Sequence, residues 1–106
     1  MLAFSALADP TRLRIVEMLS NEGSLAASQI SKRFFVSAPA ISQHLKVLKT
    51  ANLVQMETKA QQRIYTLNPT GITEIENWVS RMKQIWEERF DALDALLKAE
   101  TEKEND

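Results

Sequence analysis

The sequence predicts a mainly α-helical protein with one small β-hairpin, organised around a helix near residues 38–50. Three observations predict this fold class. Apolar residues recur at intervals of three and four in most segments, polar and apolar residues alternate in two short runs, and only two glycines and three prolines interrupt the 106-residue chain. A chain of this length forms one compact domain. We therefore expect a single domain over residues 1–106, with a core in 1–69, a long helix over 70–99 and a frayed tail over 100–106.

Four helices are predicted before the hairpin. A short one covers residues 1–8, and the second begins at Asp9-Pro10, where Asp9 caps the helix and proline suits the first helical position. It ends near Gly23, which suits a left-handed cap. The third helix covers about residues 27–34, and a turn of about three residues leads to Ser37, which caps the fourth helix. Two helices joined by so short a turn are typical of a helix-turn-helix unit.

Two alternating runs follow the fourth helix, over residues 53–59 and 62–67. The connection between them is polar and short, but it lacks the Asn-Gly or Asp-Gly pair that favours a two-residue turn. Asn68-Pro69 ends the second run. A helix pair followed by a two-stranded ribbon is the order of elements in a winged helix-turn-helix. We therefore predict that architecture: four helices, two strands and a long last helix.

The fourth helix has two distinct faces. Ile41, Leu45 and Leu48 lie close together on a helical wheel and are predicted to be buried. The outward side carries Pro39, Gln43, Lys46 and Thr50, with Ser42 at its flank. An amide can pair with adenine, a lysine can reach guanine or phosphate, and the free N–H groups after Ser37 suit a phosphate. This face predicts a helix for the major groove of double-stranded DNA. The alternative is the solvated polar face that every surface helix has.

The net charge of −1 conceals an uneven distribution. Residues 1–69 contain eight Lys and Arg against four Asp and Glu, a net charge of +4, whereas residues 70–106 contain five against ten, a net charge of −5. The candidate DNA helix therefore lies in the basic half. The hairpin tip adds Lys59, Gln62 and Arg63 as contacts to the DNA backbone or minor groove. The tip is the weaker part of the DNA hypothesis, since hairpin tips are usually polar.

Three segments resemble one protein family: ALADPTRLRIVEML, SAPAISQHLKVLKTANLV and RIYTLNP. They are similar to the ArsR family of bacterial and archaeal winged-helix transcription regulators, over about residues 1–69. The later W-x(7)-W-E-E-R-F-D-x-L run resembles one branch of that family, commonly small repressors. The resemblance implies a homodimer built from the first and last helices. It also implies DNA contacts at Ser37, Ala38, Pro39, Ser42, Gln43, His44 and Lys46, with the strand pair as the wing.

Metal sensing is not expected. Many members of the family use a cysteine motif in the third helix or paired histidines and acids in the last one, and this chain has no cysteine and only one histidine. We therefore predict no metal site, no cofactor and a regulator that is not metal-responsive. The acids of the last helix (Glu87, Glu88, Asp91 and Asp94) suit a divalent cation less well than a solvated face. No enzyme motif is present, so no catalytic residue is predicted.

The long last helix carries apolar residues for about seven turns, more than a winged helix of ~65 residues can cover. Its stripe therefore predicts a second subunit. The predicted dimer interface consists of Leu2, Phe4, Leu7, Trp78, Val79, Met82, Trp86, Phe90, Leu93 and Leu97. The alternative is that the aromatic residues of this stripe line an effector pocket.

Two residues have open roles. His44 lies between the buried and outward faces, and it either donates to a phosphate or is a half-buried structural histidine bonded to the backbone. Arg12 has three interpretations: a phosphate contact, a pair with an acid of the partner subunit, or a simple surface role.

Together these expectations describe a sequence-specific DNA-binding transcriptional regulator, a repressor that binds a palindromic operator as a homodimer. The alternative is a winged-helix protein-interaction or dimerisation module with little DNA binding. No stretch approaches the ~20 apolar residues that span a bilayer, and the absence of cysteine fits a reducing cytoplasm. Neither the effector nor the operator follows from the sequence.

Overall fold

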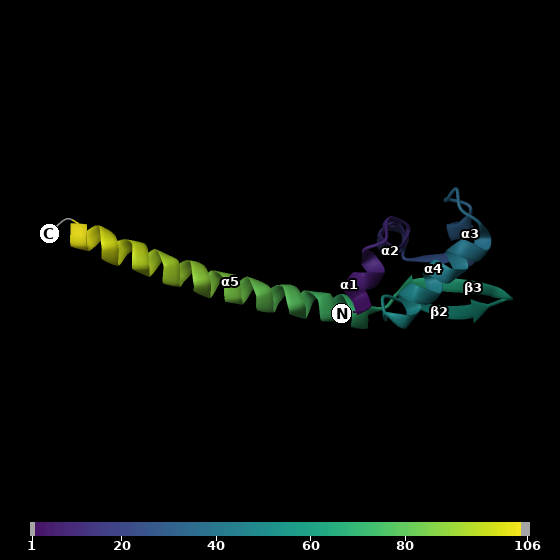
Figure 1. Cartoon of the computed structure of the whole chain (residues 1–106). Coiled ribbons are helices and arrows are strands. Elements are labelled where there is room, and N and C mark those ends of the chain that lie inside the picture. Colours follow the sequence, from purple (N-terminus) through teal and green to yellow (C-terminus); the bar gives the residue numbers. More distant parts are fainter. Residues whose placement is uncertain (1, 105–106) are drawn as a thin grey trace. The chain divides into compact units, whose positions relative to one another are not determined.

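The computed structural model describes residues 2–104, and the chain divides into two compact units between Ile75 and Glu76. The elements in chain order are α1 (Leu2–Leu7), α2 (Pro10–Glu22), β1 (Ser24–Ala26), α3 (Ala27–Ser31), α4 (Ala38–Thr50), β2 (Val54–Lys59), β3 (Gln62–Leu67) and α5 (Pro69–Glu104) (Figure 1). This order confirms the predicted mainly helical, winged helix-turn-helix class and adds one strand. No helix in the described part of the chain is long and apolar enough to cross a bilayer.

The two ends of α2 are closed as predicted. The Asp9 carboxylate accepts a hydrogen bond of 3.0 Å from the backbone N–H of Arg12, and Pro10 occupies the first turn, where its missing N–H costs little. At the other end, Gly23 has a φ of 85°, and its N–H donates to the Leu19 carbonyl over 2.8 Å. Glycine adopts this positive φ without the steric cost that a Cβ would impose. Both ends of α2 are therefore set by local sequence.

The sheet has three strands, not the two predicted. β2 and β3 form the expected antiparallel hairpin, with Val54 opposite Leu67 and Lys59 opposite Gln62. β1 adds to the free edge of β3, with Ser24 opposite Thr66 and Ala26 opposite Ile64, so the order is β1-β3-β2. Three residues are too few to show an alternating pattern. Pairing with a strand some forty residues later in the chain defines β1.

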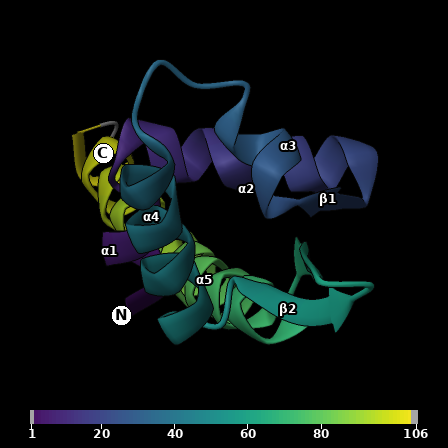
Figure 2. The same ribbon diagram turned by 90° about the vertical axis from the view of Figure 1, so that its right-hand side faces the viewer.

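The third helix is shorter than the predicted 27–34 and ends at Ser31. Two turn hydrogen bonds follow, from the N–H of Arg33 to Ile30 and from the N–H of Phe34 to Ser31, each spanning three residues. The connection to α4 is therefore longer than the predicted turn of about three residues, and its path is plain in Figure 2. Ile30 is buried, and Phe34, four residues later, packs against the same core.

The hairpin turns through only Ala60 and Gln61, whose φ angles are 47° and 70°. Two successive positive φ angles are the signature of a type I′ turn, which matches the twist of the flanking strands. Residues with a Cβ adopt this conformation at a steric cost. The turn therefore forms without the Asn-Gly pair that normally favours it.

The core of the first unit joins every element from α1 to β3, with Ile15, Leu19, Ile30, Leu45, Leu48 and Leu53 among its buried side chains. The first turn of α5 also meets this core at Gly71. The N–H of Gly71 donates to the Asn52 carbonyl over 2.9 Å, and a Cβ at Gly71 would lie only 2.4 Å from that oxygen. Asn52 has a φ of 58°, a left-handed conformation that asparagine tolerates better than most residues with a Cβ. Glycine is thus required where α5 starts.

The last helix is longer than the predicted 70–99. It begins at Pro69, with the Asn68 side chain accepting from the N–H of Thr70 over 3.0 Å, and it continues to Glu104. Residues 100–104, predicted to belong to a frayed tail, are therefore helical, and residues 105 and 106 lie outside the described part. Polar composition alone did not reveal the end of the helix, because Glu and Lys are good helix formers.

Candidate nucleic-acid interface

The candidate interface is built on α4. Ser37 caps the helix, its hydroxyl accepting from the N–H of Ala40 over 3.2 Å, and Pro39 occupies the first turn. The buried side consists of Ile41, Leu45 and Leu48, each at most 1% exposed. These three anchors determine which way the other side chains of α4 point. The predicted division of this helix into a core side and an outward side is therefore confirmed.

The outward side of α4 is available for contacts. Six of the predicted DNA-binding residues are exposed: Ser37, Ala38, Pro39, Ser42, Gln43 and Lys46. Within the described residues, the side chains of Ser42, Gln43 and Lys46 have no hydrogen bond or ion pair. An amide, an ammonium group and a hydroxyl thus lie close together near the first half of one helix. None of them is bonded to another described residue of the chain. This combination can contact base edges and phosphates.

α1 borders this surface. A depression of about 300 Å³ runs between α1 and α4, lined on the α4 side by Gln43, Lys46 and Val47 and on the α1 side by Leu2 and Ser5. The two candidate base-recognition residues therefore lie on the edge of α4 that faces α1.

His44 belongs to a polar cluster between α1, α2 and α4. Its Nδ1 lies 3.2 Å from a guanidinium nitrogen of Arg12 and 3.8 Å from the Asp9 carboxylate. A guanidinium has only donors, so Nδ1 accepts from Arg12 in the tautomer that makes this hydrogen bond. The same Arg12 donates to the backbone carbonyl of Ala6 over 2.7 Å. This hydrogen bond satisfies a carbonyl in the last turn of α1 that has no partner within the helix. Arg12 thus holds α1 and α4 to the start of α2.

The cluster favours the structural interpretation of both open residues. His44 is half-buried, and its partner is a side chain, not the backbone as the structural alternative specified. Arg12 is engaged inside its own subunit rather than free for phosphate. The N–H of Arg12 that bonds to the Asp9 carboxylate, aided by the nearby His44 and Arg12 side chains, lowers the pKa of Asp9 below its usual 3.8 despite partial desolvation. Asp9 therefore keeps its charge to a lower pH than a free aspartate does.

The predicted wing residues all lie at the hairpin tip and are exposed. Lys59 approaches the Glu57 carboxylate at 3.8 Å, so part of its charge is offset on its own strand. Gln62 and Arg63 line a shallow depression with Ala26 and Ser28, beside the start of α3. Arg63 has no acidic partner among the described residues. The free positive charge of the tip therefore comes mainly from Arg63.

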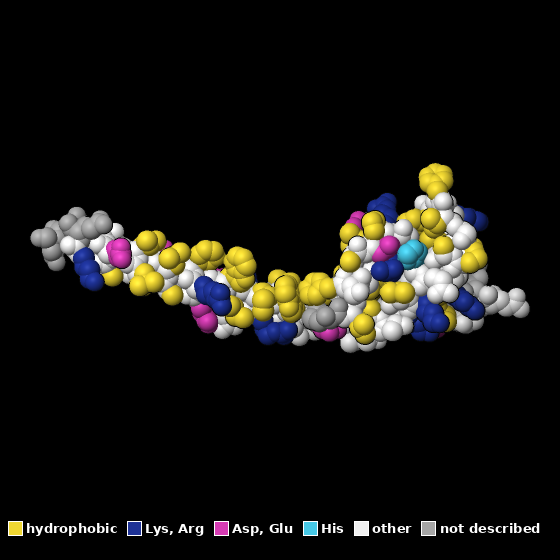
Figure 3. Space-filling view, viewed as in Figure 1, with side chains coloured by type: hydrophobic (Ala, Val, Ile, Leu, Met, Phe, Trp, Pro, Cys, Tyr) yellow, Lys and Arg dark blue, Asp and Glu magenta, His cyan; other side chains and the backbone are white. Residues whose placement is uncertain are grey.

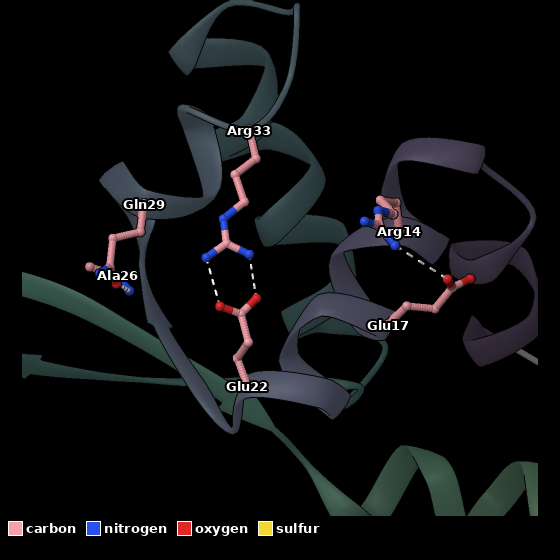
Figure 4. A network of polar contacts seen from close by, with 6 residues as sticks. All are labelled: Arg14, Glu17, Glu22, Ala26, Gln29 and Arg33. Atoms are coloured by element: carbon pink, nitrogen blue, oxygen red, sulfur yellow. Dashed lines mark hydrogen bonds and ion pairs between the residues drawn. The ribbon is translucent and has the colours of Figure 1, made fainter.

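An exposed ion pair, not predicted from the sequence, connects α2 to the loop before α4. Both nitrogens at the end of Arg33 meet the two carboxylate oxygens of Glu22 in a fork, one of them at 2.7 Å (Figure 4). The hydrogen bonds to Arg33 lower the pKa of Glu22, and the same bonds raise the pKa of Arg33. Figure 4 also shows Arg14 paired with Glu17 on α2, at 3.8 Å. Arg33 is thus not available to DNA.

Phe35 lies in the connection before α4, and its side chain is fully exposed two residues before the cap of that helix. Val36 beside it is also exposed. This exposure was hinted at in the sequence, because Phe34 and Phe35 are adjacent. A short segment on the surface can bury only one of two neighbouring side chains. Phe34 packs inward and Phe35 points outward as a result.

The second unit carries most of the predicted dimer-interface residues. Exposed large side chains follow α5 at Trp78, Val79, Trp86, Phe90, Leu93 and Leu97, whereas Met82 is half-buried. Figure 3 shows hydrophobic side chains gathered along one edge of this helix, with charged side chains along the other. In the first unit, Leu2 and Phe4 are exposed, but Leu7 packs against the core of its own subunit. Leu7 and Met82 are therefore the two half-buried members of the predicted interface.

Comparisons with known proteins agree with this geometry. Residues 9–56 match the model of the arsR family of bacterial regulatory proteins. The HTH-type transcriptional regulator Rv2034 of Mycobacterium tuberculosis is 47% identical over 74% of this chain and 73% of its own length. The transcriptional repressor SdpR of Bacillus subtilis is 38% identical over 72% and 83%. An ArsR-like transcriptional regulator from Rhodococcus sp. RHA1 superimposes with a TM-score of 0.77 at 26% identity, over 90% of this chain and 89% of that chain.

Proposed function

This chain belongs to the arsR family of bacterial regulatory proteins, and from that premise we propose that it is a repressor that binds a palindromic operator as a homodimer. It is a DNA-binding transcriptional regulator rather than an enzyme, as its relatives are. The observation that carries the proposal is the outward side of α4. Ser42, Gln43 and Lys46 stand exposed and unpaired opposite a fully buried anchor of Ile41, Leu45 and Leu48.

The residues of α4 have separate roles in this proposal. Gln43 recognises a base edge through its amide, for which adenine is the matching base. Lys46 contacts guanine or a phosphate, and the N-terminus of α4 at Ser37 binds a phosphate of the backbone. Arg63 and Lys59 of the wing contact flanking backbone. His44 contributes by holding α4 in place through Arg12.

A direct test measures binding to DNA selected from a random pool, at several salt concentrations. Gln43→Ala should cost about 1–3 kcal/mol and relax the preference at one base pair in each half-site. Lys46→Glu should weaken binding to all sequences and lower the salt dependence of the association constant. Lys98→Glu, which makes the same charge change on an exposed residue of α5, is the matched control and should bind as the parent does.

The rival proposal is a winged-helix interaction module with little DNA binding, and the net charge of −1 favours it. It predicts that the pool yields no enriched sequence and that both α4 variants behave like the parent. An enriched sequence without twofold symmetry would instead preserve DNA binding and refute the palindromic operator.

The homodimer is supported by the exposed apolar side chains on α1 and α5. Exposed apolar side chains that follow one face of a helix mark an interaction site, and no helix in the described residues could span a membrane. A twofold dimer presents two α4 helices to successive major grooves, about 34 Å apart, which is why the operator should be palindromic. Sedimentation velocity, with and without DNA, measures the stoichiometry.

The regulator is proposed to be independent of metal ions. Its sequence contains no cysteine, and the described residues contain no group of three His, Cys, Asp or Glu side chains placed to hold a metal. The one histidine directs its Nδ1 at Arg12. Operator affinity should therefore be the same with zinc, cadmium, arsenite or a chelator. Metal-dependent release would refute this part of the proposal while leaving DNA binding intact.

Repression, rather than activation, is favoured by the relative named as a repressor. The proposed compartment is the cytoplasm, where the chromosomal DNA of a bacterium lies. A reporter gene placed behind the selected operator should be expressed less when this protein is present. Higher expression would identify an activator.

A further inference from the structure

The loop that leads into α4 presents a phenyl ring to solvent. Phe35 is 109% exposed, whereas no other large apolar side chain of the described residues exceeds 66%, and its neighbour Val36 is exposed as well. Figure 2 shows this loop entering the N-terminal end of α4 away from the sheet. Single apolar residues are common on protein surfaces, but this ring is covered by nothing. It therefore retains the whole of the free energy that its burial would release.

The loop holds Phe35 between fixed residues. On one side, Phe34 packs against the core, and the guanidinium of Arg33 forks onto the Glu22 carboxylate at the end of α2. On the other side, the Ser37 hydroxyl caps α4. A ligand that covers the ring therefore orders the loop at little cost in conformational entropy.

Phe35 lies beside the candidate DNA-contacting surface. It precedes Ser37 by two residues, so their Cα atoms are at most ~7 Å apart, and the side chains of Ala38 and Pro39 that follow are small and exposed. The proposed function puts this end of α4 in a major groove about 12 Å wide. Gln43 lies six residues after Ser37, about 9 Å along the helix axis. Phe35 therefore meets the groove at least about three base-pair steps of ~3.4 Å from the Gln43 contact.

The chemistry of a phenyl ring limits what it can contact in that groove. The ring has no hydrogen-bond donor or acceptor, and polar base edges or phosphates beneath it would lose hydration without compensation. The one apolar group on the base edges of the major groove is the C5-methyl of thymine, and phenylalanine is among the side chains that contact it. The partner that matches Phe35 is therefore a thymine.

We propose that Phe35 contacts the C5-methyl group of one thymine in each half-site of the operator and so contributes to sequence specificity. This inference rests on the proposed DNA binding, and it adds an apolar contact to the polar ones from Gln43 and Lys46. The thymine lies on the side of the half-site that faces the N-terminus of α4.

A protein partner fits the same surface less well. A stable protein interface covers about 800 Å² on each side and has an apolar centre. Between Gly23 and Leu45, however, Phe35 and Val36 are the only large apolar side chains that are exposed among the described residues. DNA needs no further apolar area here, because its phosphates bind the free N–H groups at the start of α4.

Deoxyuridine tests the contact, because it differs from thymidine only in lacking the C5-methyl group. Each thymine of the operator selected from a random pool is replaced in turn, at matching positions of the two half-sites, and the affinity of the full-length protein is measured by fluorescence anisotropy. At one position the parent should lose about fourfold in affinity for each methyl group, or about fifteenfold for the symmetric pair.

Three variants assign that methyl dependence to a side chain, with circular dichroism to verify the fold. Phe35→Ala should bind the unmodified operator at least about fifteenfold more weakly than the parent and should no longer respond to deoxyuridine at that position. Phe35→Leu, which stays apolar, should keep part of the response. Gln43→Ala is the matched control. It should bind more weakly because of its own base pair, yet show the parent's full response to loss of the methyl group.

The inference is wrong if Phe35→Ala responds to every deoxyuridine as the parent does, or if no deoxyuridine weakens the parent. It is also wrong if Phe35→Ala weakens binding to all sequences alike, which indicates a backbone contact, or leaves operator affinity unchanged, which leaves the ring to a protein partner. Failure of the proposed function differs from all of these. A parent protein that binds no DNA from the pool refutes DNA binding itself and, with it, the thymine contact.

Discussion

α4 and the second unit's part of α5 carry the same apolar spacing in different surroundings. In α4, Ile41, Leu45 and Leu48 follow each other at intervals of four and three, and at most 1% of each residue is exposed. In α5, Trp86, Phe90 and Leu93 follow each other at the same intervals and are 61%, 57% and 50% exposed. The local pattern is equivalent. Only the presence of neighbouring elements differs.

The comparison separates two kinds of stability. The stripe of α4 is covered by the first unit's own core, so its contribution is the same at every protein concentration. The stripe of α5 is uncovered within the subunit, so burial there must come from another molecule and depends on concentration. A helical period thus shows that one face is apolar, and the rest of the chain determines whether that face folds inward or binds a partner.

The largest expected effect comes from the core side. Leu48→Ala should lower the free energy of unfolding by about 2–5 kcal/mol, because it removes a fully buried side chain and leaves a cavity. Leu93→Ala should have no comparable effect in dilute protein and should act only where the dimer forms. Urea unfolding at two protein concentrations distinguishes the two. A concentration-independent loss from Leu93→Ala would show that the α5 stripe is covered within the subunit.

Gly71→Ala should follow in size, with a loss of about 1–3 kcal/mol. The new Cβ would lie 2.4 Å from the Asn52 carbonyl oxygen, and this clash outweighs the helix preference of alanine. Ser80→Ala, on the exposed part of the same helix, should change stability by less than about 0.5 kcal/mol. Thermal unfolding of both variants tests whether the start of α5 belongs to the core while its later part does not. A Gly71→Ala protein as stable as the parent would argue against that close approach.

The hairpin turn offers a stabilising change of about 1 kcal/mol. Replacing Ala60 and Gln61 together by Asn and Gly provides residues that adopt positive φ readily, so the strain at both positions is relieved. The gain should be independent of protein concentration, since the hairpin belongs to the first unit. Gln62→Gly places a glycine in β3 instead and should destabilise. Unfolding midpoints in urea measure both, and a destabilised double variant would refute the type I′ turn.

The Asp9 cap predicts a smaller, pH-dependent effect. The folded pKa of Asp9 is lowered, so its charge stabilises the fold above the unfolded pKa of about 3.8 and this contribution is lost as pH falls through the lower folded pKa. Asp9→Asn keeps an oxygen acceptor but carries no charge. The parent should therefore be more stable than Asp9→Asn at neutral pH, and the difference should shrink below about pH 4. Denaturation at a series of pH values checks this, and a constant difference would contradict it.

Phe35→Ser should have the smallest effect, less than about 0.5 kcal/mol, because the side chain is fully exposed. Phe34→Ser is the matched comparison, since Phe34 packs against the core and its loss should be larger. Any decrease in operator affinity with Phe35→Ser would then assign the loop before α4 to the DNA contact, without a change in fold to explain it.

Much of the candidate site was predictable because its determinants are local. The capping of α2 by Asp9 and of α4 by Ser37 depends on residues within one turn. The buried and outward sides of α4 follow from a period of 3.6 residues. The hairpin register follows from alternation, and the positive φ of Gly23 and Asn52 follows from residue type. The family motifs lie in these same segments.

The remaining features depend on residues far apart in the sequence. His44 was undecided because its partner, Arg12, lies on another helix, thirty-two positions away. The pairing of Arg33 with Glu22 was not predicted either, because the two residues lie on different elements, eleven positions apart. The end of α3 at Ser31 and the extension of α5 to Glu104 were also missed, because propensity defines helix interiors better than ends.

By itself, the sequence determined where the recognition helix begins, which of its residues face the core and which remain free for DNA, since these follow from neighbours three and four residues apart. Only the tertiary structure decided that β1 joins the sheet, that Arg12 joins α1 to α4 through His44, and that Gly71 leaves room for the Asn52 carbonyl. The physical reason is that these features are contacts between distant parts of the chain, whose partners no local pattern identifies.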